Sequence, residues 1–473
     1  MNGILALDQG TTSSKAYVWR DGRFTLAGRR EQRQILPRPG WVEHDAGELL
    51  RHLRELIALA GPCAFAGLAN QGETAVAWDA ATGRPLHHAI VWQDDRTRDA
   101  VARLRADGVE VLTLERAGLP LDPYFSATKL RWLLDHAGGA RDLLRQGRLR
   151  LGTSDAFFLH NLTGTCATDV STASRTSLMD LRRLCWDADL CAAFGVPMEC
   201  LPAIRPTTGD FGHLADGTPL VASIVDQQAA LFGHGCTDPG DLKITFGTGA
   251  FALGLTDTLP AAGLPDGLLP TCAWQLGDKP PRYALDGGIL TAGAAVDWLG
   301  GVGLLADVAQ LDAFDGPSAL EQGLAFVPAL AGLGCPHWDR DARGCFLGLE
   351  LGTSPALLRR AVLEGIAMRA AELVGAMRDR AGPPARIAID GGLSRSTFFA
   401  GFLAAALGRP IEVAEAADVT ALGVLHLCLH AAGQPERPRP QPWRPVMPDA
   451  ILPAVLHERF QQAVALSRAW GRG

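Results

Sequence analysis

The sequence predicts an α/β protein built from two related halves. The chain has 473 residues, which is beyond the size at which a single hydrophobic core usually stops growing, so two domains are expected. Apolar runs typical of strands alternate with stretches of helical spacing, as in α/β folds. A strand–glycine–threonine–strand pattern in residues 5–19 returns in residues 242–255, almost halfway along the chain. This repeat indicates a duplicated fold with one glycine-rich hairpin in each half.

The composition excludes several classes of partner. Hydrophobic residues make up 47% of the chain and charged residues 20%, the balance of a soluble globular protein. The formal net charge of −7, without any basic block, argues against nucleic acid or an anionic membrane surface as a partner. No apolar stretch reaches the roughly 18 residues of a membrane span, and the N-terminus lacks the features of a signal peptide.

The ten cysteines predict reduced thiols in a cytoplasmic protein. They are scattered, without CxxC pairs or clusters at metal-ligand spacing. Cys191 and Cys200 are the pair that could approach each other, but core packing is the expected role of both.

The N-terminal region predicts strands around a helix. Ile4–Leu7 is a short apolar run, Lys15–Trp19 follows a hydroxyl-rich turn, and Cys63–Asp79 contains two further predicted strands. Between them, Asp45 precedes a periodic apolar pattern that extends to about Leu59 and is expected to cap a helix.

Later segments predict further helices and a connector. Residues 126–147 and 354–382 have helical spacing, and the second stretch ends at a glycine followed by two prolines, which stop a helix. The proline-rich residues 434–445 exclude a long helix or a central strand. Residues 453–470 predict a terminal helix.

The turn after the first predicted strand is suited to phosphate and metal. Asp8 ends that strand and is followed by a glycine and by four hydroxyl residues, 11–14. Backbone N–H groups and hydroxyls in such a turn can donate to phosphate oxygens. Asp8 is placed to hold Mg²⁺ directly or through water, and Lys15 adds positive charge. A solvated turn that caps a neighbouring element is the alternative.

Three further patterns carry candidate chemistry. Asp226, at the end of an apolar run, suits a general base that takes a proton from a hydroxyl, with helix capping as the alternative. In residues 387–408 a glycine pair between a strand and a helix lets the backbone approach adenine, with a plain turn as the alternative. Glu73, Trp92 and Tyr124 suit a small polar pocket, although scattered aromatic residues usually belong to the core.

Ten sequence blocks, in this order along the chain, join these patterns. The blocks are DQGTTSSKA, GWVEHDA, NQGETAVAWDAATGRPLHHAIVWQDDRT, GLPLDPYFSATKLRWLLDH, TDVSTASRTSLMDL, DQQAALFGHG, TFGTGAF, AGAAVDWL, PHWDRDARG and DGGLSRS with the later TALG. Through them the chain resembles, essentially from end to end, the FGGY family of carbohydrate kinases and, within it, the glycerol kinases. The resemblance implies two ribonuclease-H-like domains of the actin–hexokinase–Hsp70 type around a central cleft. Residues 1–238 would hold the substrate pocket, the first phosphate hairpin and the base, and residues 239–473 the second hairpin and the adenosine site.

The resemblance also implies an activity and its residues. The implied reaction is phosphorylation of a small polyol by ATP and Mg²⁺, with glycerol to glycerol 3-phosphate as the first expectation. Asp226 would be the catalytic base and Asp8 the metal ligand. The implied ATP-binding residues are Thr11, Thr12, Ser13, Lys15, Thr248, Gly293, Asp297, Gly392 and Ser396. The implied polyol-binding residues are Gly72, Glu73, Trp92, Tyr124, Asp226, Gln227 and Phe251.

The chain departs from the glycerol kinases at four positions and in one loop. Gly72 stands where they usually carry arginine, and loss of such a charged donor costs about 1.5–3 kcal/mol. Because glycine also leaves room, a larger polyol or ketose of the erythritol, xylitol, ribulose or xylulose type is the alternative substrate. Asp297 and Ser396 replace a frequent glutamine and asparagine, and Val225 replaces a frequent glycine. Residues 209–228 lack the Gly/Arg-rich loop that binds fructose 1,6-bisphosphate in some bacterial glycerol kinases, so we expect no such control.

A non-catalytic, nucleotide-gated regulatory protein of the same fold is a more distant alternative. Such a protein needs neither an acid at Asp226 nor a pocket formed by Glu73, Trp92 and Tyr124. The expected partner is therefore a small polyol or sugar. The resemblance is compatible with a homodimer or a homotetramer.

Overall fold

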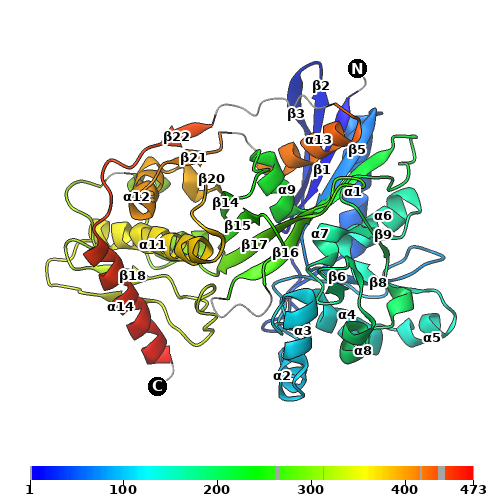
Figure 1. Cartoon of the computed structure of the whole chain (residues 1–473), viewed down its shortest axis with the longest axis horizontal. Coiled ribbons are helices and arrows are strands. Elements are labelled where there is room, and N and C mark those ends of the chain that lie inside the picture. Colours follow the sequence, from blue (N-terminus) through cyan, green and yellow to red (C-terminus); the bar gives the residue numbers. More distant parts are fainter. Residues whose placement is uncertain (1–2, 262–266, 313, 416–417, 435–442, 472–473) are drawn as a thin grey trace.

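Two β-sheets with the same internal strand order form the centres of the two lobes of the chain (Figure 1). The computed structural model describes residues 3–261, 267–312, 314–415, 418–434 and 443–471. Each sheet contains three antiparallel strands followed by two strands parallel to the first of them in the chain, and the second sheet has one further strand at each edge. The predicted duplication is therefore confirmed at the level of topology.

The two sheets have the following strands. The first, in spatial order, consists of β13 (Leu220–Val225), β5 (Phe65–Asn70), β1 (Ile4–Gln9), β2 (Ser13–Arg20) and β3 (Arg23–Glu31). The second consists of β16 (Leu269–Trp274), β17 (Arg282–Ile289), β15 (Ala250–Thr256), β14 (Asp241–Phe246), β20 (Arg386–Gly391), β21 (Ile411–Val413) and β22 (Arg444–Val446).

Smaller sheets and the helices surround them. The other strands are β4 (Glu43–His44), β6 (Ala75–Asp79), β7 (Ala89–Ile90), β8 (Leu149–Thr153), β9 (Ala167–Asp169), β10 (Met179–Asp180), β11 (Cys185–Trp186), β12 (Ala203–Arg205), β18 (Ala325–Val327) and β19 (Cys345–Leu347). The α-helices are α1 (Ala46–Ala60), α2 (Arg98–Ala106), α3 (Val109–Ala117), α4 (Ser126–His136), α5 (Ala140–Arg145), α6 (Ser154–Thr163), α7 (Val170–Ala173), α8 (Ala188–Phe194), α9 (Asp226–Gly233), α10 (Gly293–Gly301), α11 (Pro355–Ala381), α12 (Thr397–Leu407), α13 (Val419–Ala431) and α14 (Ala454–Gly471).

The predicted local elements are found, with one difference. Asp45 caps α1, because its carboxylate accepts hydrogen bonds from the backbone N–H groups of Gly47 (2.8 Å) and Glu48 (3.2 Å). Helix α11 stops before Gly382, as its sequence predicts. Residues 126–147 form two helices, α4 and α5, because the chain leaves the helical conformation at Ala137 and turns through Gly139 with a φ of 80°.

The C-terminal expectations also hold where the structure describes them. Residues 435–442 of the proline-rich connector lie outside the described residues. The following strand, β22, is short and lies at the edge of its sheet, where proline is tolerated. All ten cysteines, Cys191 and Cys200 among them, are free thiols. None of the helices in the described part of the chain is both long and apolar enough to cross a membrane.

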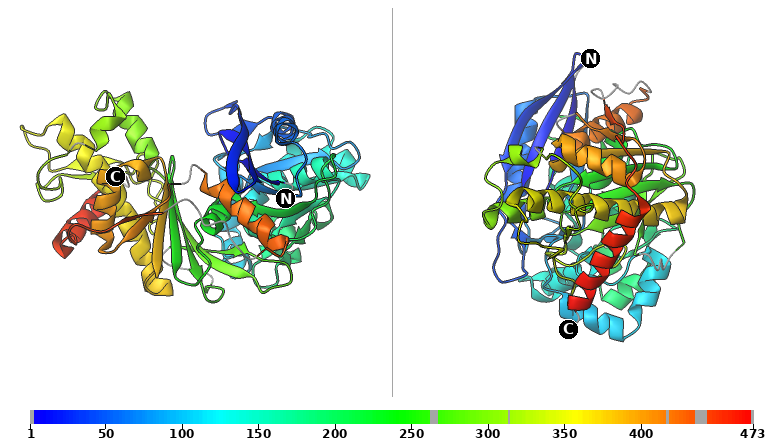
Figure 2. Two further views of the ribbon diagram at one scale, coloured as in Figure 1. Left: turned by 90° about the horizontal axis from the view of Figure 1, so that it is seen from above. Right: turned by 90° about the vertical axis from the view of Figure 1, so that its left-hand side faces the viewer.

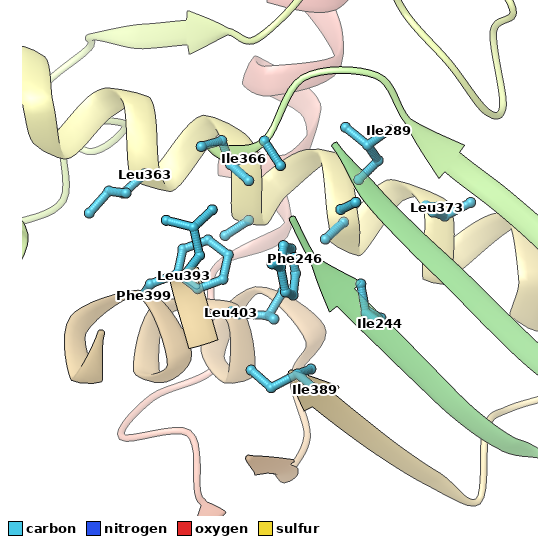
Figure 3. Packing of buried hydrophobic residues seen from close by; sticks show 14 of the residues in the cluster. Ile244, Phe246, Ile289, Leu363, Ile366, Leu373, Ile389, Leu393, Phe399 and Leu403 are labelled. Carbon is cyan, nitrogen blue, oxygen red and sulfur yellow. The ribbon is translucent and has the colours of Figure 1, made fainter. Parts of the chain in front are cut away.

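The core of the second lobe anchors its hairpin. Phe246, the last residue of β14, packs edge-to-face against Phe399 of α12, with ring centroids 4.9 Å apart (Figure 3). Ile366 of α11 and Ile389 of β20 belong to the same buried cluster. The turn that follows Phe246 therefore starts from a fixed point of the core.

Helix α13 connects the two lobes. In the chain it lies between β21 and β22, two strands of the second sheet. In space it lies in the lobe of the N-terminal strands, shown in orange beside them (Figure 2), where its apolar residues share one buried cluster with β1, β5 and β13. A Cβ atom at Gly423 would lie 1.9 Å from the carbonyl oxygen of Ala229 in α9, and one at Gly233 would lie 2.1 Å from that of Val419. Both positions therefore require glycine, because the two helix backbones touch there.

We predict that Gly423→Ala destabilises the protein. Alanine normally stabilises a helix interior by about 1 kcal/mol relative to glycine, but here its methyl group would overlap a backbone oxygen, and such overpacking costs about 1–3 kcal/mol. Urea unfolding should show a lower midpoint for this variant. The matched control is Gly375→Ala in α11, where a Cβ meets nothing within 4 Å and the midpoint should not fall. Equal midpoints for the two variants would contradict the prediction.

Candidate functional site

The hairpin between β1 and β2 is held by its own backbone and by an ion pair. The N–H of Gly10 donates to the carbonyl of Ser13 at 3.1 Å and closes the turn. Asp8 and Lys15 are opposite each other in the two strands, and Lys15 Nζ lies 3.4 Å from Asp8 Oδ2. The same ammonium lies 2.5 Å from Asp418 Oδ2, and Asp418 caps α13. Lys15 therefore ties the first sheet to the start of α13.

Asp8 has the surroundings expected of a ligand of a hydrated cation. Its pKa is raised to about 8, mainly by burial and also by the carboxylates of Asp418 and Asp226, although the Lys15 ammonium acts in the opposite direction. No group of three or more His, Cys, Asp or Glu side chains in the described residues forms a ready-made metal shell. Mg²⁺ usually keeps several waters and binds one or two carboxylates plus phosphate oxygens, so an oxygen donor in this acidic environment fits it.

All seven residues predicted for the polyol pocket line one cavity of about 100 Å³, together with Thr11 of the first hairpin. The ring centroid of Trp92 lies 5.7 Å from that of Tyr124 and 6.2 Å from that of Phe251, both edge-to-face. The indole Nε1 donates to Thr11 Oγ1 at 3.0 Å. The three aromatic rings thus form one wall, and the indole N–H fixes that wall to the hairpin.

Asp226 lies at the start of α9 without capping it. Val225 takes the capping position and no side chain caps the helix there, so Asp226 is not the N-cap of α9 but the first residue of its first turn. The pKa of Asp226 is raised to about 7, mainly by burial and also by Glu73, while the positive charge of the buried Lys243 acts in the opposite direction. Lys243 Nζ also donates to Gln227 Oε1 (2.5 Å) and to Thr245 Oγ1 (2.9 Å), which holds the Gln227 amide beside Asp226.

Gly72 and Glu73 form a strained corner of the cavity. Glu73 has a φ of 57°. Residues other than glycine seldom adopt this left-handed backbone conformation, and those that do are concentrated at functional sites. A Cβ atom at Gly72 would lie 2.9 Å from Val225 Cγ2. The valine therefore occupies part of the space that glycine leaves.

Sequence reasoning missed two charged residues of this cavity. Arg175 Nε donates to Glu73 Oε1 at 2.7 Å, and its Nη2 lies 2.9 Å from Asp286 Oδ2. Arg175 and Asp286 both line the cavity. Arg175 stands within one of the family-like blocks, TDVSTASRTSLMDL, but neither residue has a spacing signal that marks it as a site residue.

A second cavity, of about 430 Å³, lies against the second hairpin. Five of the residues predicted to bind ATP line it: Thr248, Gly293, Asp297, Gly392 and Ser396. A Cβ atom at Gly293 would lie 2.6 Å from the carbonyl oxygen of Gly247, so glycine is needed where the hairpin packs on α10.

The Ser396 hydroxyl both accepts and donates a hydrogen bond within the protein. It accepts the N–H of Phe399 at 3.0 Å, which caps α12, and donates to Asp312 at 2.7 Å. Asp312 and Arg395, which were not predicted, also line this cavity. Thr12, Ser13 and Lys15 line neither of the two cavities and stay on the first hairpin.

Comparison with known proteins agrees with this arrangement. Residues 3–233 match the N-terminal domain, and residues 242–432 the C-terminal domain, of the FGGY family of carbohydrate kinases. The chain is 44% identical to a glycerol kinase of Alkalilimnicola ehrlichii over 452 residues, which cover 92% of this chain and 91% of the relative.

Two solved structures resemble the whole chain. The glycerol kinase of Plasmodium falciparum with ADP superposes with a TM-score of 0.88 at 29% identity, covering 100% of this chain and 98% of the other. The xylulose kinase of Rhodospirillum rubrum superposes with a TM-score of 0.84 at 25% identity, covering 100% of both chains. The protein therefore has the two-domain α/β fold of actin type, and it belongs to the FGGY family of carbohydrate kinases, phosphotransferases that act on an alcohol group.

Proposed function

We propose that the protein transfers the terminal phosphate of ATP to a hydroxyl of a small polyol, with glycerol as the first candidate. The observation that carries the proposal is the cavity of about 100 Å³, whose lining combines Asp226 and Glu73 with the aromatic rings of Trp92, Tyr124 and Phe251. The identity of 44% to a glycerol kinase supports the same substrate.

The proposed chemistry uses Asp226 as a general base. Its carboxylate accepts the proton of the polyol hydroxyl while the oxygen bonds to the terminal phosphorus of ATP and the bond from that phosphorus to the bridging oxygen breaks, releasing ADP. Positioning and charge neutralisation supply most of the catalysis in such transfers. Asp8 would hold Mg²⁺, which supplies positive charge to the phosphate oxygens when bound.

We place the adenosine part of ATP in the larger cavity and its phosphates between the two hairpins. Thr248 lines the larger cavity and Thr11 the smaller one, which supports hairpins on either side of the transferred phosphate. Thr12 and Ser13 would donate from the first hairpin. The Lys15 ammonium, which already contacts the carboxylates of Asp8 and Asp418, would also contact a phosphate oxygen of ATP.

The division into residues 1–238 and 239–473 stays a prediction. Residues 234–240 connect α9 to β14, which agrees with a division there. Helix α13 belongs to the second predicted domain by sequence but packs on the sheet of the first. A homodimer or homotetramer likewise stays a prediction.

A kinase of a larger polyol or ketose is the second candidate. The likeness to a xylulose kinase and the glycine at position 72 favour it. The contact of Val225 with the space beside Gly72 and the small cavity favour glycerol instead. A non-catalytic role has less support, because Asp226 is not the N-cap of its helix and lines a cavity together with Glu73 and three aromatic side chains.

Asp226→Asn tests the proposed function. ATP consumption should be measured with glycerol, erythritol, xylitol, dihydroxyacetone, ribulose and xylulose. We expect the native protein to prefer glycerol and the variant to lose a factor of about 10²–10⁴ in kcat, the usual contribution of a general base. The exposed Asp278→Asn is the matched control and should keep the native rate. Retention of more than about a tenth of the activity in Asp226→Asn would remove the proposed base.

The pH dependence of activity should report the ionisation of Asp226. Because burial raises its pKa to about 7, the base is protonated at acidic pH, and kcat/KM should fall about tenfold per pH unit on the acidic side. Lys243→Met removes a positive charge that lowers this pKa, so the acidic limb should move to higher pH. The exposed Lys279→Met should leave the limb in place. An unchanged limb in Lys243→Met would contradict the assignment.

Gly72→Arg combined with Val225→Gly tests the control of specificity. The added guanidinium should lower the KM for glycerol by about 10- to 100-fold, as expected for a charged hydrogen bond, and should exclude larger polyols. Gly72→Arg alone should be less effective, because its Cβ meets Val225. Val225→Gly alone is the control. If the preference for glycerol over larger polyols is the same in all variants, position 72 does not determine it.

A further inference from the structure

We propose that Arg175 binds a hydroxyl of the polyol through Nη1 and that this contact determines which pattern of hydroxyls the cavity accepts. The proposal rests on the proposed phosphorylation of a polyol and deepens it. Sequence patterns alone gave no role to this residue, and the glycine at position 72 removes the arginine expected to bind the substrate there.

Arg175 has a fixed place beside the cavity. It lies directly after α7, whose start is capped by the Asp169 carboxylate, and its own N–H donates to the carbonyl of Thr172 at 3.0 Å. The residue is 3% exposed and lines the polyol cavity. Its guanidinium carbon lies 5.8 Å from the ring centroid of Tyr124, on the aromatic wall. The side chain therefore reaches the cavity from a rigid segment.

The guanidinium fork of Arg175 is only partly used. Nε donates to Glu73 and Nη2 pairs with Asp286, but the buried Nη1 makes no hydrogen bond of standard geometry to the residues that the structure describes. The Tyr124 hydroxyl is the neighbouring group that also acts on this guanidinium. A buried donor without an acceptor costs about 1–3 kcal/mol. A ligand oxygen in the adjoining cavity would satisfy it.

The charges around the cavity explain why a hydroxyl would bind there. Glu73, Asp226 and Asp286 are acceptors when ionised, so they bind the hydrogen of a hydroxyl but not its lone pairs. Among the described residues that line the cavity, Arg175 is the one with a cationic side chain. A polyol oxygen that donates to a neighbouring carboxylate can accept from Nη1 at the same time. The pair of Arg175 with Glu73 therefore recognises one hydroxyl from both sides.

A structural role is the competing explanation, because Arg175 also bridges two buried carboxylates. The two roles differ in how the substrate matters. If Arg175 only maintained the fold, its substitution would reduce activity by the same factor for every substrate. If Nη1 binds one hydroxyl, substitution of Arg175 would remove the higher kcat/KM of substrates that carry that hydroxyl. The substitution and the loss of the hydroxyl remove the same contact, so their effects on the free energy would not add.

The test compares glycerol with 1,2-propanediol and 1,3-propanediol, each of which lacks one hydroxyl. We expect the native protein to lose about 10- to 100-fold in kcat/KM for the analogue that lacks the contacted hydroxyl. Arg175→Lys keeps the positive charge but loses the planar guanidinium with its several donors. In this variant the kcat/KM for glycerol should differ from that for the analogue by no more than about threefold. The KM for ATP should stay unchanged. An equal loss for all three substrates would overturn the proposal.

Controls separate this result from general damage. Arg360→Lys makes the same change at another buried arginine, which pairs with Glu364 at 2.8 Å in α11, and should keep the native ratio. Arg175→Gln, which keeps one donor without the charge, provides a second variant if Arg175→Lys does not fold. Its ratio should fall in the same way, and an unchanged ratio would overturn the proposal.

A separate measurement distinguishes failure of the proposed function from failure of the proposed role of Arg175. Calorimetric titration of the native protein with glycerol, without ATP, reports polyol binding independently of turnover. If the native protein neither binds nor phosphorylates any polyol, both proposals fall. If it phosphorylates glycerol and Arg175→Lys keeps the native ratio between substrates, only the role of Arg175 falls.

Discussion

The close crossing of α9 and α13 is the constraint on which the site depends. The backbones of the two helices touch at Gly233 and Gly423, where no side chain fits. Both helices also begin at the site, because α9 starts with Asp226 and α13 is capped by Asp418. A single backbone contact therefore fixes where the proposed base lies relative to the first hairpin. A larger residue at the crossing would move both helix starts together.

Charged side chains near the site also fix the relative positions of its parts. Three cationic residues near the site each contact a residue of the other half of the chain: Arg175 with Asp286, Lys15 with Asp418 and Lys243 with Gln227. Buried ion pairs add little net stability, because desolvation offsets their attraction. Their effect here is orientation. The pair of Arg175 with Asp286 and the hydrogen bond from Lys243 to Gln227 form only when the two lobes pack as they do in this structure, and the pair of Lys15 with Asp418 fixes the start of α13 on the first sheet. The site is thus complete only in that arrangement.

Sequence patterns were sufficient for the local elements and for the motifs at strand ends. The Asp45 cap, the two hairpins and the polyol-pocket residues follow from short-range signals or from the order of the blocks along the chain. Arg175 and Asp286 could not be found in this way, because their meeting depends on how the loop after α7 packs against β17 of the other lobe. The bond from Lys15 to Asp418 joins residues 403 positions apart and has no local signal either.

The substitution at position 72 shows why a single position does not define the pocket. The sequence alone predicts that glycine there enlarges the cavity, but Val225 Cγ2 lies 2.9 Å from the place that a Cβ atom at position 72 would take. Residues in such contact are energetically coupled, so the two positions change the cavity as a pair. Together they make this wall apolar and remove a donor from it. Under the proposed function, recognition of the hydroxyls then depends on the other lining residues, among them the neighbouring Glu73, which has a strained backbone conformation and accepts a hydrogen bond from Arg175.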